Sequence, residues 1–252
     1  MDTIAVFSTK TDKYARYRWD YAPQAIQALF DGVHLSRTFV AADIGAGTGI
    51  LSRHLAGRVA RLYAVEPNPD MRRLAQIELR RFPSAEIVDG RAEATTLPAC
   101  SVDLITVAQA IHWFDPAPTR REFRRILKPG GWLALLRNYG TNKVLAQAIR
   151  ALRIPENGIE PGQVAQRPES RPAIYYYGSP GFQKTTYPFV LREPWEAFIG
   201  ALLSTSDMPD EDHPLYAHFE RAARRVFDRF STGGLLEVRG ETELCLGHVI
   251  QS

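Results

Sequence analysis

The stretch that decides the fold reads Phe39 Val40 Ala41 Ala42 Asp43 Ile44 Gly45 Ala46 Gly47 Thr48 Gly49 Ile50 Leu51. A short apolar run over 39–44 turns through three glycines into a helical pattern over 48–57, so we expect a strand, a tight loop and a helix start. Glycine has no Cβ, so a ligand can lie directly on the main chain, and a helix start points free N–H groups at it. The stretch predicts a binding loop.

The glycine spacing separates two classes of nucleotide-like ligand. A dinucleotide loop has the pattern G-x-G-x-x-G, whereas Gly45, Gly47 and Gly49 give G-x-G-x-G with Asp43 just upstream. A carboxylate there would repel a pyrophosphate but can accept a hydrogen bond from an ammonium group, directly or through a loop N–H. We therefore expect an amino-acid nucleoside rather than NAD. Gly45, Ala46 and Gly47 would lie against it, with Asp43 at its amino-acid end.

A second acid follows the next apolar run, Arg61 Leu62 Tyr63 Ala64 Val65 Glu66 Pro67 Asn68. Glu66 comes 17 residues after Gly49, near the spacing of about 20 at which a neighbouring strand offers a carboxylate to a ribose diol. An acid at the end of a buried apolar run is costly unless it has a partner. We therefore expect Glu66 to bind the ribose of the nucleoside.

With later motifs at 90–93, 101–115 and 127–131, these two segments resemble class I S-adenosylmethionine-dependent methyltransferases. The resemblance is to the small-molecule, type 11 group that includes trans-aconitate methyltransferase-like proteins, and it covers about 14–138. It implies S-adenosyl-L-methionine as cofactor, S-adenosyl-L-homocysteine as product, and no metal. Further cofactor contacts that it implies are at Tyr14, Arg18, Pro67, Met71, Ala92, Glu93, Gln109 and Trp113.

Two of these implied contacts carry alternatives. Tyr14 and Arg18 fall in a segment that such enzymes use as a lid, although Trp19 stands where proline is usual. We expect the Arg18 guanidinium to pair with the cofactor carboxylate, the alternative being that Arg18 packs over Trp19 or reaches solvent. Met71 is expected either against adenine or in a helix core.

Strand and helix patterns alternate between 39 and 137. Strands are expected at 39–44, 61–66, 85–88, 102–107 and 132–137, and helices at 22–30, 48–57, 68–81 and 116–127. Alternation implies an α/β fold with a parallel sheet, joined by right-handed crossovers, and ligands bind at the carboxyl ends of its strands. We predict a Rossmann-like doubly wound sheet, and the resemblance implies seven mostly parallel strands with an antiparallel last strand.

We expect one methyltransferase domain over 1–252. Its parts are an N-terminal lid at 1–37, the cofactor-binding core at 38–138, cap insertions at 139–181 and 192–232, and final strands at 183–191 and 239–251. The first insertion is rich in proline and glycine, which favour loops. Helical patterns recur at 195–203 and 215–230.

His112 is the candidate catalytic residue. Methyl transfer from a sulfonium is an in-line displacement, so the enzyme mainly holds a nucleophile about 3 Å from the methyl carbon. His112 could act as a base or donate to an acceptor oxygen, the alternative being a hydrogen-bonded wall residue. Trp113 and Phe114 would line an apolar pocket around the sulfonium, or pack in the core.

Composition and charge indicate which classes of binding partner to expect. The net charge of +3 is a mild bias, and the arginine clusters near 72–81 and 120–125 have the spacing of solvated helix faces. Cys100 and Cys245 have no metal-ligand spacing, and no apolar run approaches the roughly 18 residues of a membrane span. We expect a cytoplasmic protein, monomeric or homodimeric, that binds neither membrane nor nucleic acid.

The leading expectation is methyl transfer to an oxygen, carboxylate or hydroxyl, of a small-molecule acceptor. Two alternatives stay open: an RNA methyltransferase, and a protein that binds S-adenosylmethionine without transferring its methyl group. The first lacks an added RNA-binding module. The second is compatible with the glycines and Glu66, because binding and chemistry use different residues.

Overall fold

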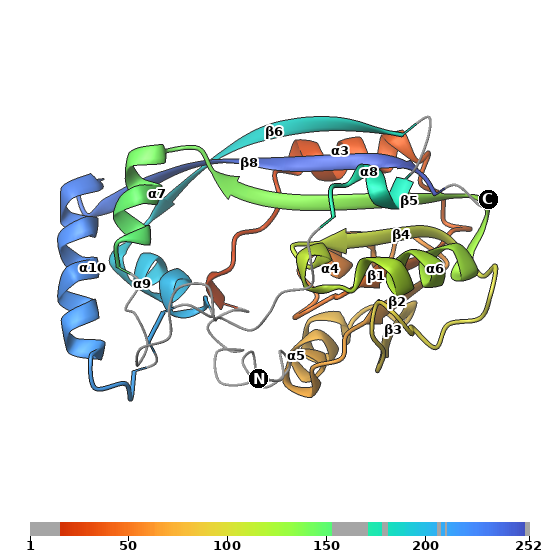
Figure 1. Ribbon diagram of the computed structural model, residues 1–252, viewed down its shortest axis with the longest axis horizontal. Coiled ribbons are helices and arrows are strands. Elements are labelled where there is room, and N and C mark those ends of the chain that lie inside the picture. The colour runs from red at the N-terminus through yellow and green to blue at the C-terminus, as the bar shows by residue number, and fades with distance from the viewer. Residues whose placement is uncertain (1–15, 153–170, 178–180, 206–207, 210, 250–252) are drawn as a thin grey trace. The chain divides into compact units, whose positions relative to one another are not determined.

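The computed structural model describes residues 16–152, 171–177, 181–205, 208–209 and 211–249. Its strands form one eight-stranded sheet in the order β3-β2-β1-β4-β5-β8-β6, with the short β7 paired to β8 (Figure 1). By contact density the chain divides into two compact units. Unit 1 comprises 1–19, 139–166 and 188–241, and unit 2 comprises 20–138, 167–187 and 242–252. Tyr14 lies outside the described residues.

The parallel part of the sheet belongs to unit 2. It contains β1 (Val40–Ile44), β2 (Arg61–Val65), β3 (Ala85–Val88), β4 (Val102–Ala108) and the first part of β5 (Leu127–Gly140). β1 pairs in parallel with β2 and β4, β2 with β3, and β4 with β5. Strand order therefore reverses between β1 and β4, which confirms the predicted doubly wound topology. In Figure 1, β8 (Leu235–His248) lies between β5 and β6 (Phe182–Glu193) and runs antiparallel to both.

Helices cover both faces of this sheet because successive strand residues point to opposite sides. Ala41 and Leu62 pack in one core with Leu29 of α3 (Pro23–Gly32) and with residues of α4 (Ser52–Leu55) and α5 (Pro69–Leu79). Ala42 and Tyr63 pack in the other with residues of α6 (Pro116–Ile126) and α8 (Ile174–Tyr177). The strand centres are buried on both faces, and the candidate site residues lie at the strand ends.

Two of the helices begin as the sequence indicates. Asn68 caps α5, its side chain accepting from the N–H groups of Asp70 and Met71, and Pro69 occupies the first turn. Asp115 caps α6 in the same way, accepting from the Ala117 N–H, and Pro116 follows it. Capping acids and amides followed by proline are favoured starts for helices, and here they fix where the chain leaves the sheet edge.

Some elements differ from the prediction. The helix expected at 48–57 is only α4, Ser52–Leu55, flanked by turns, because Gly49 and Gly57 take positive φ on either side. A helix of one turn supplies little dipole, so the N–H groups that we expect to face a ligand are those of the loop itself. β5 begins at Leu127 rather than 132, since a register shift opposite Val102 and Leu104 takes up the glycine turn. The eighth strand is the two-residue β7 (Ser231–Thr232).

Unit 1 has its own core. α7 (Lys143–Arg150), α9 (Trp195–Leu203) and α10 (Tyr216–Phe230) pack Leu145, Phe198 and Phe227 together with Leu236 and Val238 of β8. α7 lies inside the stretch expected to be loop. β8 starts at Leu235, earlier than the predicted 239, because its first residues cover this core. Residues 16–19 also belong to unit 1, where Trp19 Nε1 donates to Glu193 Oε1 at 2.7 Å.

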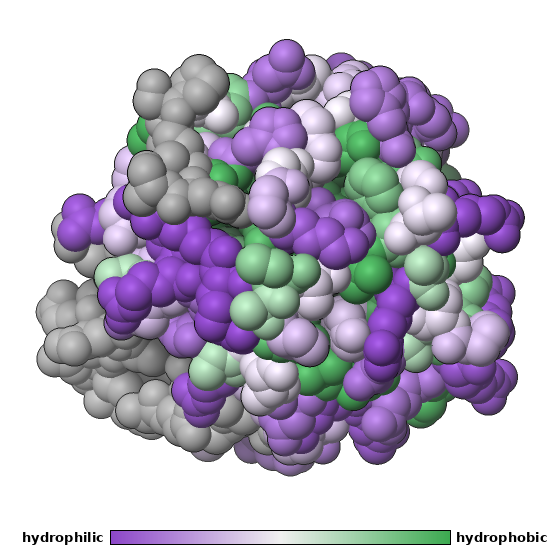
Figure 2. Space-filling model, turned by 90° about the vertical axis from the view of Figure 1, so that its right-hand side faces the viewer, coloured by the Kyte–Doolittle hydropathy of each residue, from purple (hydrophilic) through white to green (hydrophobic). Residues whose placement is uncertain are grey.

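The surface of the described residues is mixed in polarity. On the face in Figure 2, small hydrophobic areas lie between hydrophilic residues. No helix in the described ranges is both long and apolar enough to cross a membrane. That face presents no broad apolar surface outside the grey atoms.

Candidate cofactor and active site

The glycine loop, residues 45–49, joins β1 to the turn before α4. Gly45, Gly47 and Gly49 have φ of +70°, +58° and +88°, a region that residues with a Cβ avoid. The N–H groups of Gly45 and Ala46 donate to Val65 O at 2.9 and 3.1 Å, which ties the loop to the end of β2. A Cβ built on Gly47 would meet no described atom within 4 Å. The main chain at Gly47 therefore faces open space.

Glu66, just after β2, holds the same loop. Its Oε2 accepts from the Gly47 N–H and its Oε1 from the Asn68 N–H, each at 2.9 Å, and the residue is 8 % exposed. Burial raises the pKa of Glu66, and the two N–H donors and the nearby Arg72 guanidinium oppose that rise. A carboxylate has about four acceptor positions, so two remain for further donors such as a sugar diol.

Asp43 lies inside the sheet at the end of β1. Its Oδ2 accepts from the Ser52 hydroxyl at 2.6 Å and its Oδ1 from the Thr106 hydroxyl at 2.9 Å. Burial raises the pKa of Asp43 to about 6, against the lowering effect of these two hydroxyls. Asp43 thus joins β1 to α4 and β4, a role that sequence reasoning missed. Its contact with the amino-acid end of a cofactor stays a prediction.

Thr48 is a loop residue that sequence reasoning did not select. The residue is 5 % exposed, and within the described part of the chain its Oγ1 has no hydrogen-bond partner. A buried hydroxyl without a partner costs about 1–3 kcal/mol. A polar ligand group at the glycine loop would remove that cost. The feature of the sequence that could have identified Thr48 is its position between two loop glycines, Gly47 and Gly49.

The segment after β4 contacts the glycine loop. A Cβ on Gly45 would lie 2.7 Å from the Cβ of Ala110 and 3.0 Å from Phe114 Cζ, so only glycine fits there. Gln109 has a φ of +56°, unusual for a residue with a side chain. Its N–H donates to Leu136 O at 3.0 Å and its Nε2 to Asn138 O at 3.1 Å. The glycine loop after β1 and the segment after β4 are thus in contact, and we refer to the two together as the rim.

The remaining predicted residues have mixed placements. Ala92 is buried, and Glu93 Oε1 accepts from the Asp115 N–H at 2.8 Å, next to the segment after β4.

His112 and Trp113 are half-buried in a short 3-10 helix, η1 (Ile111–Trp113), with ring centroids 5.1 Å apart. Pro67 and Met71 adjoin the Asn68 cap, and Met71 is 4 % exposed. Arg18 belongs to unit 1, apart from the unit that holds the glycine loop.

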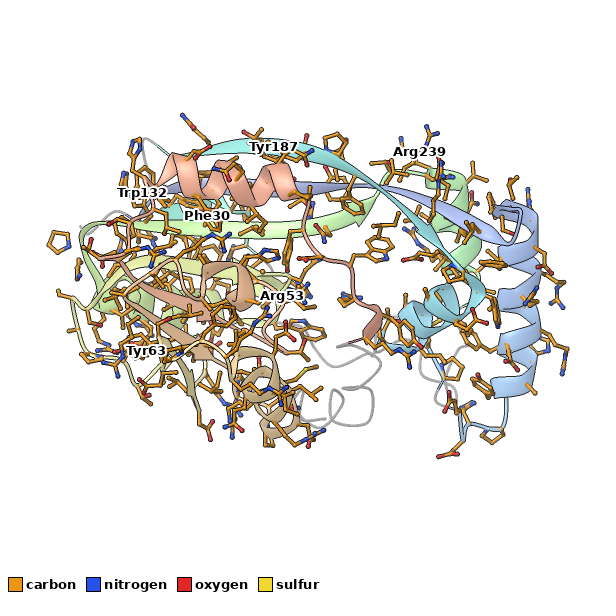
Figure 3. The ribbon with its side chains drawn as sticks, turned by 180° about the vertical axis from the view of Figure 1, so that it is seen from behind. Phe30, Arg53, Tyr63, Trp132, Tyr187 and Arg239 are labelled. Carbon is orange, nitrogen blue, oxygen red and sulfur yellow. The ribbon has the colours of Figure 1, made fainter. Side chains whose placement is uncertain are left out.

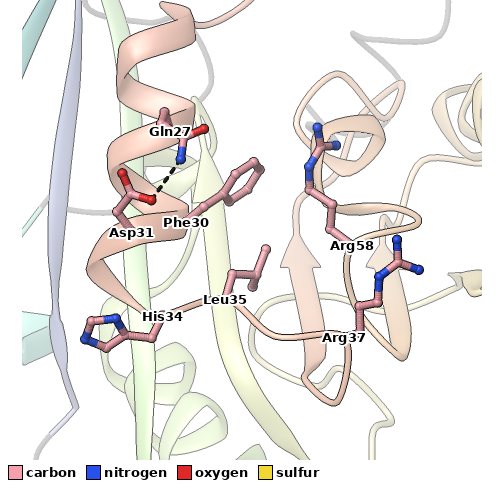
Figure 4. A pocket seen from close by; sticks show the side chains of 7 residues that line it. All are labelled: Gln27, Phe30, Asp31, His34, Leu35, Arg37 and Arg58. Carbon is pink, nitrogen blue, oxygen red and sulfur yellow. Dashed lines mark hydrogen bonds between the residues drawn. The ribbon is translucent and has the colours of Figure 1, made fainter.

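A hollow of about 450 Å³ lies elsewhere in unit 2 (Figure 4). Its lining comes from α3, from the loop before β1 and from the turn before β2, and includes Phe30, Arg37 and Arg58. Arg37 and Arg58 precede the two strands, so the hollow is at their amino ends, whereas the glycine loop follows the carboxyl end of β1. It is therefore separate from the candidate cofactor site. The described residues hold no group of three side chains placed to bind a metal ion.

Unit 2 fits an amino-acid nucleoside on three observations. The main chain at Gly47 leaves space that a Cβ would fill. Beside it, the buried Thr48 hydroxyl lacks a described partner, and the Glu66 carboxylate is held with acceptor capacity to spare. Hydroxyl and carboxylate acceptors beside open main chain suit a ligand with a sugar diol and a charged amino-acid end.

Comparison with known proteins agrees with this geometry. Residues 42–135 match the family described as methyltransferase domain. The chain is 39% identical over 137 residues to an uncharacterised methyltransferase of Mycobacterium tuberculosis, covering 54% of each chain. It is 34% identical over 139 residues to another of Schizosaccharomyces pombe, covering 55% of this chain and 54% of that one. The match spans about half the length of these curated relatives.

The fold is shared more widely. A proposed type II methyltransferase from Anaeromyxobacter dehalogenans superposes with a TM-score of 0.59 at 24% identity, covering 94% of this chain and all of the other. That likeness shows the fold alone. The family match falls on β1 to β5, the strands whose ends carry the glycine loop, Glu66 and Gln109. Residues 42–135 therefore match the methyltransferase domain family, and the chain shares the fold of a methyltransferase.

Proposed function

We propose that this protein transfers the methyl group of S-adenosylmethionine to a small-molecule acceptor. The observation that carries the proposal is the bond between the Glu66 carboxylate and the N–H of Gly47, in a loop whose main chain is open. In this proposal Glu66 accepts from the ribose hydroxyls, and the loop from Gly45 to Gly47 lies along the amino-acid part. When bound, the cofactor supplies a methyl group on a positively charged sulfur.

The acceptor in this proposal is a carboxylate or hydroxyl oxygen, with His112 beside it. The segment after β4 touches the glycine loop through Ala110 and Phe114, so a group on η1 stands near the loop. A histidine there can remove a proton from a hydroxyl or donate to a carboxylate. Trp113 offers an aromatic face, which favours a cation such as the sulfonium.

Calorimetry and a turnover panel test the function directly. We expect the purified protein to bind S-adenosylmethionine and S-adenosylhomocysteine, to ignore NAD, and to methylate a member of a panel of small carboxylates and hydroxyl compounds. Binding without turnover on that panel would favour the non-catalytic alternative. Turnover on RNA alone would favour the RNA alternative, and binding of NAD would contradict the proposal.

Replacing His112 by alanine is expected to lower kcat at least tenfold at saturating cofactor, because the acceptor oxygen would lose its proton partner. A tenfold loss corresponds to about 1.4 kcal/mol of transition-state stabilisation. The affinity for S-adenosylhomocysteine should stay within a factor of three, since His112 is not placed on the cofactor. A smaller loss of kcat would leave His112 as a wall residue.

A further inference from the structure

Three of the points where the chain enters or leaves unit 2 meet in one polar cluster. Unit 2 begins at Asp20, closes its first segment at Asn138 and resumes at Thr242. Asn138 Nδ2 donates to Asp20 O at 3.0 Å, and the Thr242 hydroxyl donates to Asn138 Oδ1 at 2.6 Å. We refer to Asp20, Asn138 and Thr242 as the clasp. All of its atoms belong to unit 2.

Two residues of the clasp, Asn138 and Thr242, are buried, and their side-chain polar groups are hydrogen-bonded. Thr242 is 0 % exposed and Asn138 is 9 % exposed. The Thr242 oxygen also accepts from the Ala22 N–H at 2.9 Å, so one hydroxyl serves both a donor and an acceptor. Removing it would leave the Ala22 N–H and Asn138 Oδ1 without that partner, and buried groups without partners are costly. The orientation of the Asn138 amide therefore depends on Thr242.

One arm of the clasp leads to the end of β1. The Asp20 carboxylate bonds to Arg53 Nη2 at 2.7 Å and to His54 Nε2 at 2.8 Å, both on α4 (Arg53 is labelled in Figure 3). Burial alone would raise the pKa of Asp20, but the bonds to His54 and Arg53 outweigh it and lower the pKa to about 2. The preceding residue, Ser52, holds Asp43. Asp20 is thus linked to the strand that precedes the glycine loop.

A second arm leads to the end of β4. The main-chain oxygen of Asn138 accepts from Gln109 Nε2 at 3.1 Å. Gln109 holds a positive φ, a conformation that persists only where surrounding contacts enforce it. Asn138 supplies one such contact. The clasp thus reaches both ends of the rim around the open main chain at Gly47.

We propose that the clasp sets the shape of the cofactor rim, with Thr242 as a positioning residue that acts through Asn138 on Gln109 and through Asp20 on α4. The proposal rests on the proposed cofactor and adds residues that do not touch it. A plain structural brace would stabilise the fold without altering the rim. The two roles differ in what happens to ligand affinity and to the Gln109 main chain.

Replacing Thr242 by valine keeps the shape of the side chain and removes its hydroxyl. We expect the Kd for S-adenosylhomocysteine to rise about tenfold, or about 1.4 kcal/mol. In the ligand-free protein, hydrogen exchange at the Gln109 amide should speed up by a similar factor. Thr242→Ser, which restores the hydroxyl, should return both values to those of the wild type.

The matched control is Thr141→Val. Thr141 follows β5, and its hydroxyl donates to Arg239 O of β8 at 3.2 Å, but Thr141 lies outside the clasp. This variant should leave the Kd and the Gln109 exchange unchanged. If Thr242→Val fails to fold, Asp20→Asn at an exposed residue removes the charge from the first arm and should raise the Kd at least threefold.

Thr242→Val could lower the melting temperature while leaving the Kd for S-adenosylhomocysteine and the hydrogen exchange at the Gln109 amide unchanged. That result would overturn the proposal and show that the clasp only stabilises the fold. Failure of Thr242→Ser to restore the two values would also overturn it. A wild-type protein that does not bind S-adenosylhomocysteine would instead contradict the proposed function. The exchange measurement needs no ligand and still decides whether Thr242 controls the rim.

Discussion

Gly47→Ala is expected to weaken S-adenosylmethionine binding about 100-fold, or about 2.7 kcal/mol, while the protein stays folded. The added Cβ meets no described atom within 4 Å, so it should not disturb packing. It would instead occupy the space in which we place the amino-acid part of the cofactor. Calorimetric titration with S-adenosylhomocysteine measures the change.

Gly233→Ala separates ligand exclusion from backbone strain. Gly233 has the same φ as Gly47, +58°, and its added Cβ likewise meets no atom of the described residues within 4 Å. Both variants should lose about 1–2 kcal/mol of unfolding free energy, because a Cβ is disfavoured at positive φ. Only Gly47→Ala should lose affinity. Equal affinities for the two variants would place the ligand somewhere other than the glycine loop.

Glu66→Gln is expected to reduce cofactor affinity by about 100-fold or more. The glutamine –NH₂ would face the N–H of either Gly47 or Asn68, so one donor would oppose another and the loop would shift. The bonds to the ribose would also lose their charge, and charge-assisted bonds are roughly twice as strong as neutral ones. Isothermal titration and thermal unfolding of the same preparation would measure both effects.

Glu122→Gln is the control for Glu66→Gln. Glu122 is also 8 % exposed, and its Oε1 accepts from the Thr95 N–H at 2.8 Å. It lies on α6, and its side-chain hydrogen bonds go to Thr95 and Arg125 and not to the glycine loop. Both substitutions should lower stability by about 1.5–3 kcal/mol, since each removes a hydrogen bond to a buried charge. If Glu122→Gln weakened binding as much as Glu66→Gln, the loss would reflect global destabilisation, and Glu66 would have no special role.

The sequence predicted the features of the site that depend on local pattern. The positive φ of Gly45 and Gly47 follows from glycine placement, and Glu66 at the carboxyl end of β2 follows from strand length. The starts of α5 and α6, within one residue of the predicted 68 and 116, are likewise local. The predicted doubly wound parallel sheet agrees with the observed order β3-β2-β1-β4-β5, in which strand order reverses between β1 and β4.

What escaped prediction depends on residues distant in the chain. Asp43 meets Thr106, 63 residues away, only because β1 and β4 pair in one register. Thr242 meets Asn138 across 104 residues. α7 escaped notice because Leu145 is buried only through the separate core that it shares with α9 and α10. Propensity is a weak guide where tertiary packing decides the outcome.

The main chain at Gln109 bears on the balance between durability and activity. A glycine there would adopt a φ of +56° at no steric cost, whereas glutamine gives up about 1–2 kcal/mol of folding free energy. This cost in folding free energy falls beside the loop that we assign to the cofactor. The side-chain amide of Gln109 is held in one orientation by its bond to Asn138. A substitution of Gln109 by glycine, made to raise the thermal stability of the protein, would also remove the bond to Asn138. We expect such a substitution to lower the proposed activity.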